Sequence, residues 1–439
     1  MPALKPKISN YYQDKKPSAI RAAQILFLKR KDKVTSINGA IGNVTLPMHP
    51  AMQKRMRELG AKGSPFENGA VIYSATKGVD EANEAFLNIL HSSGFETKGL
   101  HTQVTDGGSA AMELVVLGVS DSIREKGRPI LLLDPAYTNY LAMAARTDRK
   151  VITITRHLED SGHFSLPDFD KMEKLIKKNK PSAVIVIPYD NPTGQFMTHA
   201  EFIKLAKLAV KYDMWLISDE AYRELFYTED SPVSVWKLNE KEVPGITGRR
   251  ISIESASKVW NACGLRVGGL VTDNAEFNDR AIAEYTSNLC SNAIGQYIFG
   301  ALAHESKNDL QKWYDKQRQY YKSMMFDLNK RLEDLLPGII ISSPDSAIYS
   351  VIDFRNIAPK GFDTADFVKF CASEGKVKIS GKLYTLLSSP MAGFYNIPAG
   401  KENPGKTQIR LAYVETPEKV KLIPELMEKL FNNYLKNTK

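Results

Sequence analysis

The chain has 439 residues, 43% hydrophobic and 25% charged, which is typical of a globular protein with one or two domains. No apolar run reaches the roughly 18 residues of a membrane span, and the N-terminus lacks the apolar core of a signal peptide. Three scattered cysteines, Cys263, Cys290 and Cys371, suggest neither a disulfide framework nor a metal site. We therefore expect a cytoplasmic protein with no membrane partner and no bound metal.

The formal net charge of +9 raises the question of a nucleic-acid partner. The cations are spread along the chain, and the short basic clusters at 29–33 and 174–180 lie in helical patterns that also carry apolar residues. No nucleic-acid-binding module accompanies them, so we expect no nucleic-acid partner. A positive field of this kind favours an anionic substrate or cofactor.

Helical and strand patterns alternate through the first two thirds of the chain. A helical pattern at 18–31 comes first, and two more lie at 166–180 and 198–213. Short β-rich apolar runs, each closed by polar or Gly/Pro residues, predict buried strands at 128–135, 150–156, 182–190, 214–220 and 250–258. This order predicts a mainly parallel sheet covered by helices, with a ligand beyond the carboxyl ends of the strands.

The last third of the chain differs in character. A long helical pattern at 308–336 is followed by alternating strand patterns, "AIYSVIDF" and "TQIRLAYV". These elements predict a smaller α+β unit, against which the N-terminal helical pattern would pack.

Chemically useful side chains follow three of the predicted strands. Asn191 stands in "DNPTG", Asp219 and Tyr222 in "SDEAY", and Lys258 in "SASK". Carboxyl ends of parallel strands share one edge of a sheet, so this amide, carboxylate, phenol and amine would meet in one crevice.

Two further segments suggest a phosphate site. A Gly-Gly-Ser turn at 107–109 opens an apolar helix, whose N-terminal N–H groups would face an anion. The stretch "SASKVWNACGLRVGG", residues 255–269, holds a lysine and Arg266 but no acid, so no carboxylate would compete with a phosphate for the arginine.

The segments "DGGSAAM", "DPAYTNY", "DNPTG", "SDEAYRELFY", "SASK" with "GLRVGG", and "IRLAYV" together resemble the class I and II aminotransferases. These are fold-type-I pyridoxal-phosphate enzymes related to aspartate aminotransferase, and the resemblance covers nearly the whole chain. It implies an α/β fold, with a large domain built on a mostly parallel seven-stranded sheet and a small α+β domain from both chain ends. We accordingly predict an N-terminal arm and part of the small domain at 1–55, the large cofactor-binding domain at 56–315, and the C-terminal small domain at 316–439.

The resemblance also implies roles for the residues at the strand ends. Lys258 matches the lysine that forms the Schiff base (aldimine) with pyridoxal phosphate and then carries the substrate's α-proton. Asp219 matches the carboxylate that pairs with the pyridine nitrogen. Asn191 and Tyr222 match the donors to the phenolate oxygen, and Tyr137 in "DPAY" matches the aromatic that stacks on the ring.

The phosphate of the cofactor would have its own group of residues. Arg266, Ser255 and Ser257 resemble the phosphate cup of the family, with the backbone of Gly108 and Ser109 opposite. An arginine suits this role because its guanidinium donates two parallel hydrogen bonds to phosphate oxygens.

Three positions concern the substrate and a second subunit. Arg410 in "IRLAYV" resembles the arginine that binds the substrate α-carboxylate, and an arginine inside an apolar strand is costly without an anionic partner. Tyr73 resembles the tyrosine that reaches the phosphate of a neighbouring subunit, which implies a homodimer. In "NGAIGNV", either Ala40 or Gly39 aligns with the segment that closes over the substrate.

We therefore predict an aminotransferase that moves an amino group between an α-amino acid and a 2-oxo acid in ping-pong half-reactions. A carbon–sulfur β-lyase uses the same site residues and stays an alternative. An aminotransferase-like regulator of transcription is a more remote alternative, since its helix-turn-helix domain has no place ahead of the matched segments. The segment 286–296 holds no arginine for a distal carboxylate, and Arg280 precedes it, so aromatic and neutral substrates are as consistent with the sequence as aspartate.

Overall fold

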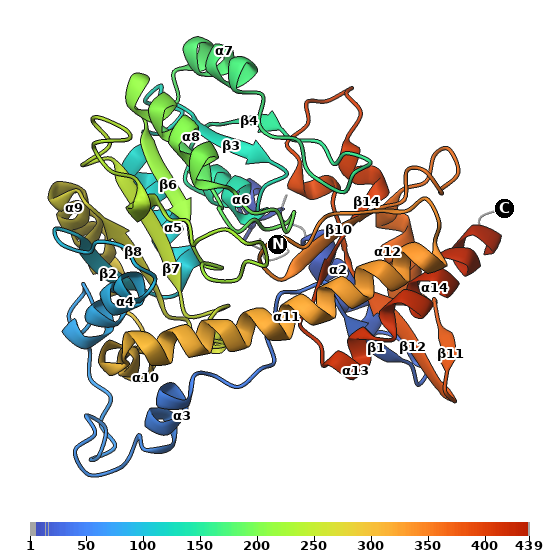
Figure 1. The fold of residues 1–439 in the computed structure, drawn as a ribbon, viewed down its shortest axis with the longest axis horizontal. Coiled ribbons are helices and arrows are strands. Elements are labelled where there is room, and N and C mark those ends of the chain that lie inside the picture. Colours follow the sequence, from blue (N-terminus) through green and yellow to red (C-terminus); the bar gives the residue numbers. More distant parts are fainter. Residues whose placement is uncertain (1–5, 14, 16, 438–439) are drawn as a thin grey trace, which may run out of the picture.

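The computed structural model describes residues 6–13, 15 and 17–437, which form a large lobe and a smaller lobe joined side by side (Figure 1). The large lobe is built on a seven-stranded sheet in the order β2-β8-β7-β6-β5-β3-β4. Its strands are β2 (His101–Thr105), β3 (Ile130–Asp134), β4 (Val151–Thr155), β5 (Ala183–Val186), β6 (Trp215–Asp219), β7 (Arg250–Ser255) and β8 (Gly268–Thr272). Only the two pairings of β8 within this sheet are antiparallel, which confirms the predicted mostly parallel sheet of seven strands.

Helices cover both faces of this sheet, because its strands are apolar on both sides. On β3, Ile130 and Leu132 join one core and Leu131 and Leu133 the other. The first core is shared with α5 (Gly108–Val119), α6 (Asn139–Arg146) and α9 (Ala275–Tyr285). The second is shared with α4 (Asp80–Ser92), α7 (Phe169–Asn179), α8 (His199–Lys211) and α10 (Ala293–Gly300).

The smaller lobe contains two further sheets. One has the order β1-β12-β11 and the other β13-β14-β10-β9. Their strands are β1 (Thr35–Asn38), β9 (Ile340–Ile341), β10 (Tyr349–Asp353), β11 (Val377–Ile379), β12 (Lys382–Leu387), β13 (Ser389–Pro390) and β14 (Gln408–Ala412). β1 pairs with β12 in parallel, so both ends of the chain build this lobe, as the resemblance implied.

The remaining helices connect and extend these sheets. α11 (Lys307–Leu335) runs along both lobes, and the domain boundary predicted after residue 315 falls inside it (Figure 1). α2 (Ala19–Leu28) packs against α12 (Thr364–Ser373) and β13. The other helices are α1 (Asn10–Gln13), α3 (Pro50–Arg57), α13 (Pro417–Val420) and α14 (Ile423–Asn437).

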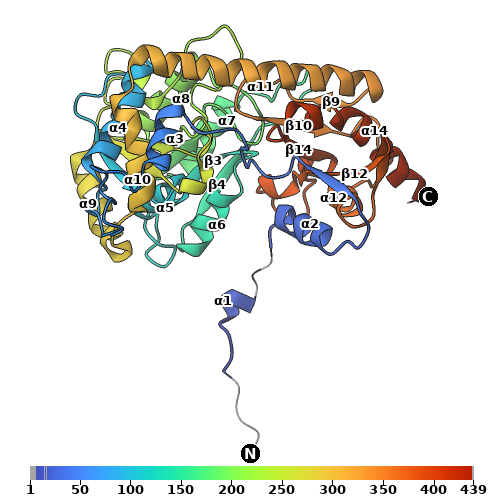
Figure 2. The same ribbon diagram turned by 90° about the horizontal axis from the view of Figure 1, so that it is seen from below.

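The N-terminal segment with α1 projects away from both lobes, as Figure 2 shows. Among the described residues, no helix has the length and apolar character needed to cross a membrane.

Candidate active site

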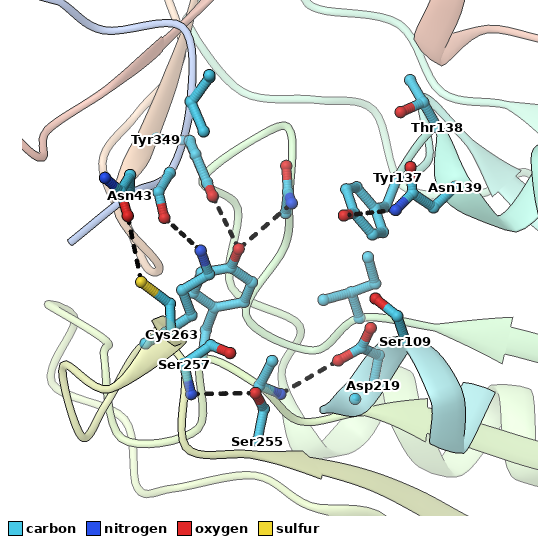
Figure 3. A pocket seen from close by; sticks show the side chains of 18 of the residues that line it. Asn43, Ser109, Tyr137, Thr138, Asn139, Asp219, Ser255, Ser257, Cys263 and Tyr349 are labelled. Atoms are coloured by element: carbon cyan, nitrogen blue, oxygen red, sulfur yellow. Dashed lines mark hydrogen bonds between the residues drawn. The ribbon is translucent and has the colours of Figure 1, made fainter. Parts of the chain in front are cut away.

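A cavity of about 790 Å³ lies between the carboxyl edge of the large sheet and the smaller lobe. Twelve of the thirteen predicted site residues line it, and Tyr73 does not. Figure 3 shows side chains from several elements converging on this space, with Asp219 and Ser109 on one side and Asn43 and Tyr349 on another. The cavity is large enough for a cofactor together with a small substrate.

Asp219 is the last residue of β6 and is half-buried at the base of the cavity. Its Oδ2 accepts a hydrogen bond of 2.5 Å from the Tyr140 hydroxyl, and its Oδ1 accepts one of 3.2 Å from the Ala221 amide. Burial raises the pKa of Asp219, while these two hydrogen bonds act in the opposite direction. A carboxylate with neutral partners is a good acceptor for a protonated ring nitrogen.

Lys258 follows β7 and extends into the cavity. Its Nζ donates a hydrogen bond to the carbonyl oxygen of Gly42. A Cβ on Gly42 would lie 2.2 Å from the Tyr349 hydroxyl oxygen and 3.1 Å from Lys258 Nζ. Glycine at position 42 therefore keeps open the space around the amine.

An amide and two phenols form a chain of hydrogen bonds beside this amine. Asn191 Nδ2 donates to the Tyr222 hydroxyl at 3.3 Å, and the hydroxyls of Tyr222 and Tyr349 lie 2.8 Å apart. Burial, followed by the neighbouring Tyr349, raises the pKa of Tyr222 well above its ordinary value. Tyr222 is therefore protonated at neutral pH and can donate a hydrogen bond to an anionic oxygen.

Glycines at the start of α5 create an anion-binding recess. Gly107 precedes the helix with φ +83°, and no side chain caps the free N–H groups. A Cβ on Gly107 would lie 2.6 Å from Arg266 Nη2, and one on Gly268 would lie 2.2 Å from the Gly108 nitrogen. Only glycine thus allows Arg266 and the neighbouring strand to approach the helix N-terminus this closely. Such a terminus favours bound phosphate.

Two serines border the same recess. The Ser255 Oγ accepts a hydrogen bond of 3.1 Å from the Ser257 amide, which fixes the turn between β7 and Lys258. Arg266 Nη1 donates to the Cys263 carbonyl at 3.0 Å. These contacts hold the two serines and the arginine around one space, into which Ser109 also faces.

Arg410 lies in β14 with 4% of its surface exposed. Its Nη1 donates to Asn191 Oδ1 and its Nη2 to the Ala40 carbonyl, both at 2.8 Å. Its Nε is buried with no hydrogen-bond partner among the described residues. Rings of Tyr349 and Phe394 flank the guanidinium at 4.4 and 5.1 Å. A buried guanidinium whose hydrogen-bond partners are all neutral suits an anionic ligand.

Two predicted tyrosines occupy different places. Tyr137 follows β3 in the cavity wall, accepts a hydrogen bond of 2.9 Å from Asn139 Nδ2, and packs edge-on against Tyr140. Tyr73 lies on the surface with 76% exposed, next to the exposed Val71 and Ile72. The cavity of its own chain therefore does not receive Tyr73.

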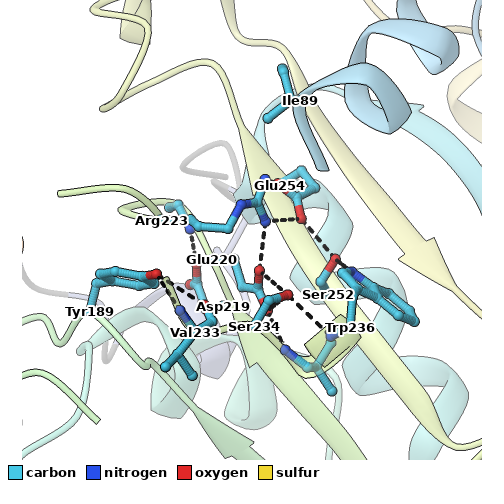
Figure 4. Close-up of polar contacts among 12 residues, drawn as sticks. Ile89, Tyr189, Asp219, Glu220, Arg223, Val233, Ser234, Trp236, Ser252 and Glu254 are labelled. Carbon is cyan, nitrogen blue, oxygen red and sulfur yellow. Dashed lines mark hydrogen bonds and ion pairs between the residues drawn. The ribbon is translucent and has the colours of Figure 1, made fainter. Parts of the chain in front are cut away.

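A buried ionic cluster lies directly behind Asp219 (Figure 4). Arg223 Nη1 contacts Glu220 Oε2 at 2.6 Å, and its Nη2 contacts Glu254 Oε2 at 2.7 Å. Burial alone would lower the pKa of Arg223, but Glu254 and Glu220 hold it well above its ordinary value. Glu220 also accepts hydrogen bonds from the side chain of Ser234, so the cluster fixes the backbone that follows Asp219.

Sequence reasoning did not identify several of these residues. Tyr349 lies in an apolar strand pattern, and Tyr140 lies on a helical face that reads as core. No feature of the sequence assigned a separate role to Gly42 or to Glu220. Arg21 was part of an ordinary amphipathic helix, but the structure places it in the cavity wall.

The lining residues suit an anionic ring compound. Among the described residues that line the cavity, four carry a cationic side chain and one, Asp219, carries a carboxylate. The recess at α5 fits a phosphate, Asp219 fits a protonated ring nitrogen, and Lys258 fits an aldehyde. These features are those that pyridoxal phosphate requires.

Comparison with known proteins gives an independent result. The family model "Aminotransferase class I and II" matches residues 40–387. The chain is 25% identical over 303 residues to an aspartate aminotransferase of Musicola paradisiaca, covering 67% of this chain and 70% of that protein. It is 26% identical over 296 residues to a probable kynurenine–oxoglutarate transaminase of Saccharomyces cerevisiae, covering 65% and 63%.

Solved structures agree in fold. An aspartate aminotransferase variant of Thermus thermophilus superposes with a TM-score of 0.78 at 20% identity, covering 97% of this chain and all of that one. The match to residues 40–387 spans most of the sequence. The chain therefore belongs to the class I and II aminotransferase family, and it is a pyridoxal-phosphate-dependent aminotransferase of fold type I.

Proposed function

We propose that this enzyme transfers an amino group between an α-amino acid and a 2-oxo acid in two half-reactions, with Lys258 as the catalytic amine. The observation that carries this proposal is that the Lys258 amine, the Asp219 carboxylate and the recess at α5 all face one cavity. Pyridoxal phosphate, when bound, supplies an electron sink that stabilises negative charge on the substrate α-carbon.

Different residues of the cavity would bind different parts of the cofactor. Arg266, with Ser255, Ser257, Gly108 and Ser109, would hold the phosphate. Asp219 would keep the pyridine nitrogen protonated, and Asn191 and Tyr222 would donate to the phenolic oxygen. Tyr137 would cover one face of the ring.

The remaining residues act on the substrate. Arg410, which lines the cavity, would bind the α-carboxylate through its guanidinium group and so orient the α-carbon. In one half-reaction Lys258 Nζ would take the proton from the substrate α-carbon and pass it to the cofactor, and in the other it would carry a proton from the cofactor to the α-carbon of the second substrate. The segment of Ala40 and Gly42 covers the amine and limits the access of water.

We also propose that the enzyme is a homodimer. The exposed group Val71, Ile72 and Tyr73 would be covered by the second subunit, and Tyr73 would reach the phosphate in the partner's cavity. The cytoplasmic location and the domain boundaries at 1–55, 56–315 and 316–439 stay predictions, although the pairing of β1 with β12 supports the assignment of the first segment to the small domain.

The first experiment is an absorption spectrum of the purified enzyme, recorded before and after the addition of single amino acids without any oxo acid. We expect a visible cofactor band that is lost as one equivalent of the matching 2-oxo acid appears, because the first half-reaction stops there. The Lys258→Ala variant is the control, and it should retain bound cofactor but release no oxo acid. If the band persists while pyruvate and ammonia accumulate, the enzyme is a β-lyase. A fully active Lys258→Ala variant would contradict the role of this lysine.

A further inference from the structure

The cavity contains one cation that the proposed function does not use. Arg21 on α2 lines the cavity together with Ser18 and Gln24. Its Nη1 donates to Gln24 Oε1 at 2.9 Å, so a neutral side chain of the same helix holds the guanidinium. Arg21 is exposed to solvent, which leaves its other donors accessible to a ligand.

The other three cations of the cavity are already placed. Arg266 lies beside Gly107 at the start of α5, Lys258 contacts the Gly42 carbonyl, and Arg410 contacts Asn191 and Ala40. In the proposed function they serve the phosphate, the cofactor aldehyde and the substrate α-carboxylate. Arg21 is therefore the remaining cation of the cavity wall, and it is available to bind a second anionic group of the substrate.

The position of α2 puts Arg21 on the substrate side of the cavity. α2 packs against β13, and β13 pairs with β14 in a register that places Ser389 opposite Arg410. Ser389 Oγ lies 3.5 Å from Arg410 Nη2. The phosphate recess, by contrast, is built from α5 and the turn after β7. A substrate whose α-carboxylate is held by Arg410 thus lies beside the helix that carries Arg21.

We propose that Arg21 binds the side-chain carboxylate of the substrate, so that the enzyme prefers acidic amino acids and the matching dicarboxylic oxo acids. This inference rests on the proposed function. An arginine suits the role because its planar guanidinium meets both oxygens of a carboxylate at once. It also supplies the distal cation that the segment 286–296 lacks, from a part of the chain far from that segment in sequence.

The test compares the wild-type holoenzyme with Arg21→Gln and Arg21→Lys. We expect Arg21→Gln to lower kcat/KM for aspartate and glutamate by about 10- to 100-fold and to change the values for leucine and phenylalanine by less than about twofold. For aspartate and glutamate, the kcat/KM of Arg21→Lys should lie between those of the wild type and Arg21→Gln. Arg124→Gln, at an exposed position away from the cavity, is the matched control. An equal loss for all four amino acids would overturn the proposal, as would unchanged kinetics with the acidic pair.

A binding measurement separates this inference from the proposed function. Calorimetry with succinate, which carries two carboxylates but no amino group, should show binding that Arg21→Gln weakens about tenfold or more, while butyrate binds both proteins equally weakly. A wild-type enzyme that transaminates leucine or phenylalanine but neither acidic amino acid would overturn the Arg21 proposal and leave the proposed function standing. An enzyme that transaminates no amino acid would overturn the proposed function, and the succinate affinities would still test Arg21.

Discussion

Two buried arginines in this protein lie in opposite kinds of surroundings. Arg223, behind Asp219, contacts the carboxylates of Glu220 and Glu254 at 2.6 and 2.7 Å. Arg410, in the cavity wall, donates to an amide oxygen and a carbonyl oxygen and forms no ion pair with a carboxylate of the described residues. The charge of Arg223 is neutralised by carboxylates of the chain itself, whereas Arg410 can pair with the carboxylate of a bound ligand.

This difference gives a physical criterion that separates a buried charge that binds a ligand from one that stabilises the fold. A cation removed from water must regain its lost hydration through partners, and a buried cation without an anionic partner costs free energy. The enzyme therefore tolerates an unfavourable Arg410 in the absence of a ligand, and binding removes that cost. Mutations that remove either arginine test this criterion.

The largest effect on stability should come from the paired arginine. Replacing Arg223 with Met leaves two buried carboxylates without a cation, and breaking such a buried cluster costs about 3–5 kcal/mol. We expect the free energy of unfolding, measured by urea denaturation, to fall by this amount. Adding Glu220→Gln and Glu254→Gln to the same variant should recover part of the loss. A variant with Arg223→Met alone and wild-type stability would show that the cluster is not structural.

Arg410 should show the reverse pattern. Arg410→Gln removes the cation that binds the α-carboxylate, and the loss of a charge-assisted hydrogen bond of about 1.5–3 kcal/mol corresponds to a fall in kcat/KM of about 10- to 150-fold. Because every amino acid carries an α-carboxylate, the fall should be similar for acidic and neutral substrates. The free energy of unfolding should change by less than about 1 kcal/mol, since no buried acid loses its partner. If unfolding becomes as easy as in the Arg223→Met variant, the two arginines do not differ as we propose.

The third prediction, with a smaller expected effect on stability than the loss of Arg223, applies the comparison to a buried carboxylic acid. Asp134, at the end of β3, accepts a hydrogen bond of 2.7 Å from the Asn396 amide, and burial raises its pKa from 3.8 to about 6. The folded protein thus binds a proton more tightly than the unfolded chain, so this group favours folding at low pH and loses that contribution as pH rises from about 4 to about 6. The upper limit of the effect is about 3 kcal/mol.

Replacing Asp134 with Asn keeps the acceptor for Asn396 and removes the titration. The variant should therefore be more stable than the wild type at pH 8, and the difference should vanish near pH 4. Thermal unfolding across this pH range measures the difference, with Asp279→Asn at an exposed position of α9 as the control. A difference that grows toward low pH would have the wrong sign and would reject the buried, protonated Asp134.

The sequence was most informative where a local pattern and a chemical group coincide. Strand ends carrying Asn191, Asp219 and Lys258 could be predicted because parallel strands bring consecutive carboxyl ends to one edge. The predicted strands at 128–135 and 250–258 and the long helix at 308–336 correspond to β3, β7 and α11. Apolar periodicity alone was sufficient for these elements.

Contacts between the lobes could not be predicted in the same way. Tyr349 and Arg21 enter the cavity through the packing of the small lobe on the large one, and no local pattern encodes that packing. The Arg223 cluster was missed for a related reason, because Glu220 and Glu254 are 34 residues apart and become neighbours only when β6 and β7 pair.

The hydrogen bond between Arg410 and the Ala40 carbonyl joins residues 370 positions apart. During synthesis on the ribosome, the recess at α5, Asp219 and Lys258 emerge well before Arg410. A nascent chain can therefore complete its phosphate site while its substrate site is still missing. The order of translation thus separates the ability to hold a cofactor from the ability to react, so that a growing chain cannot begin catalysis before its last β-strands have joined the sheet of the small lobe.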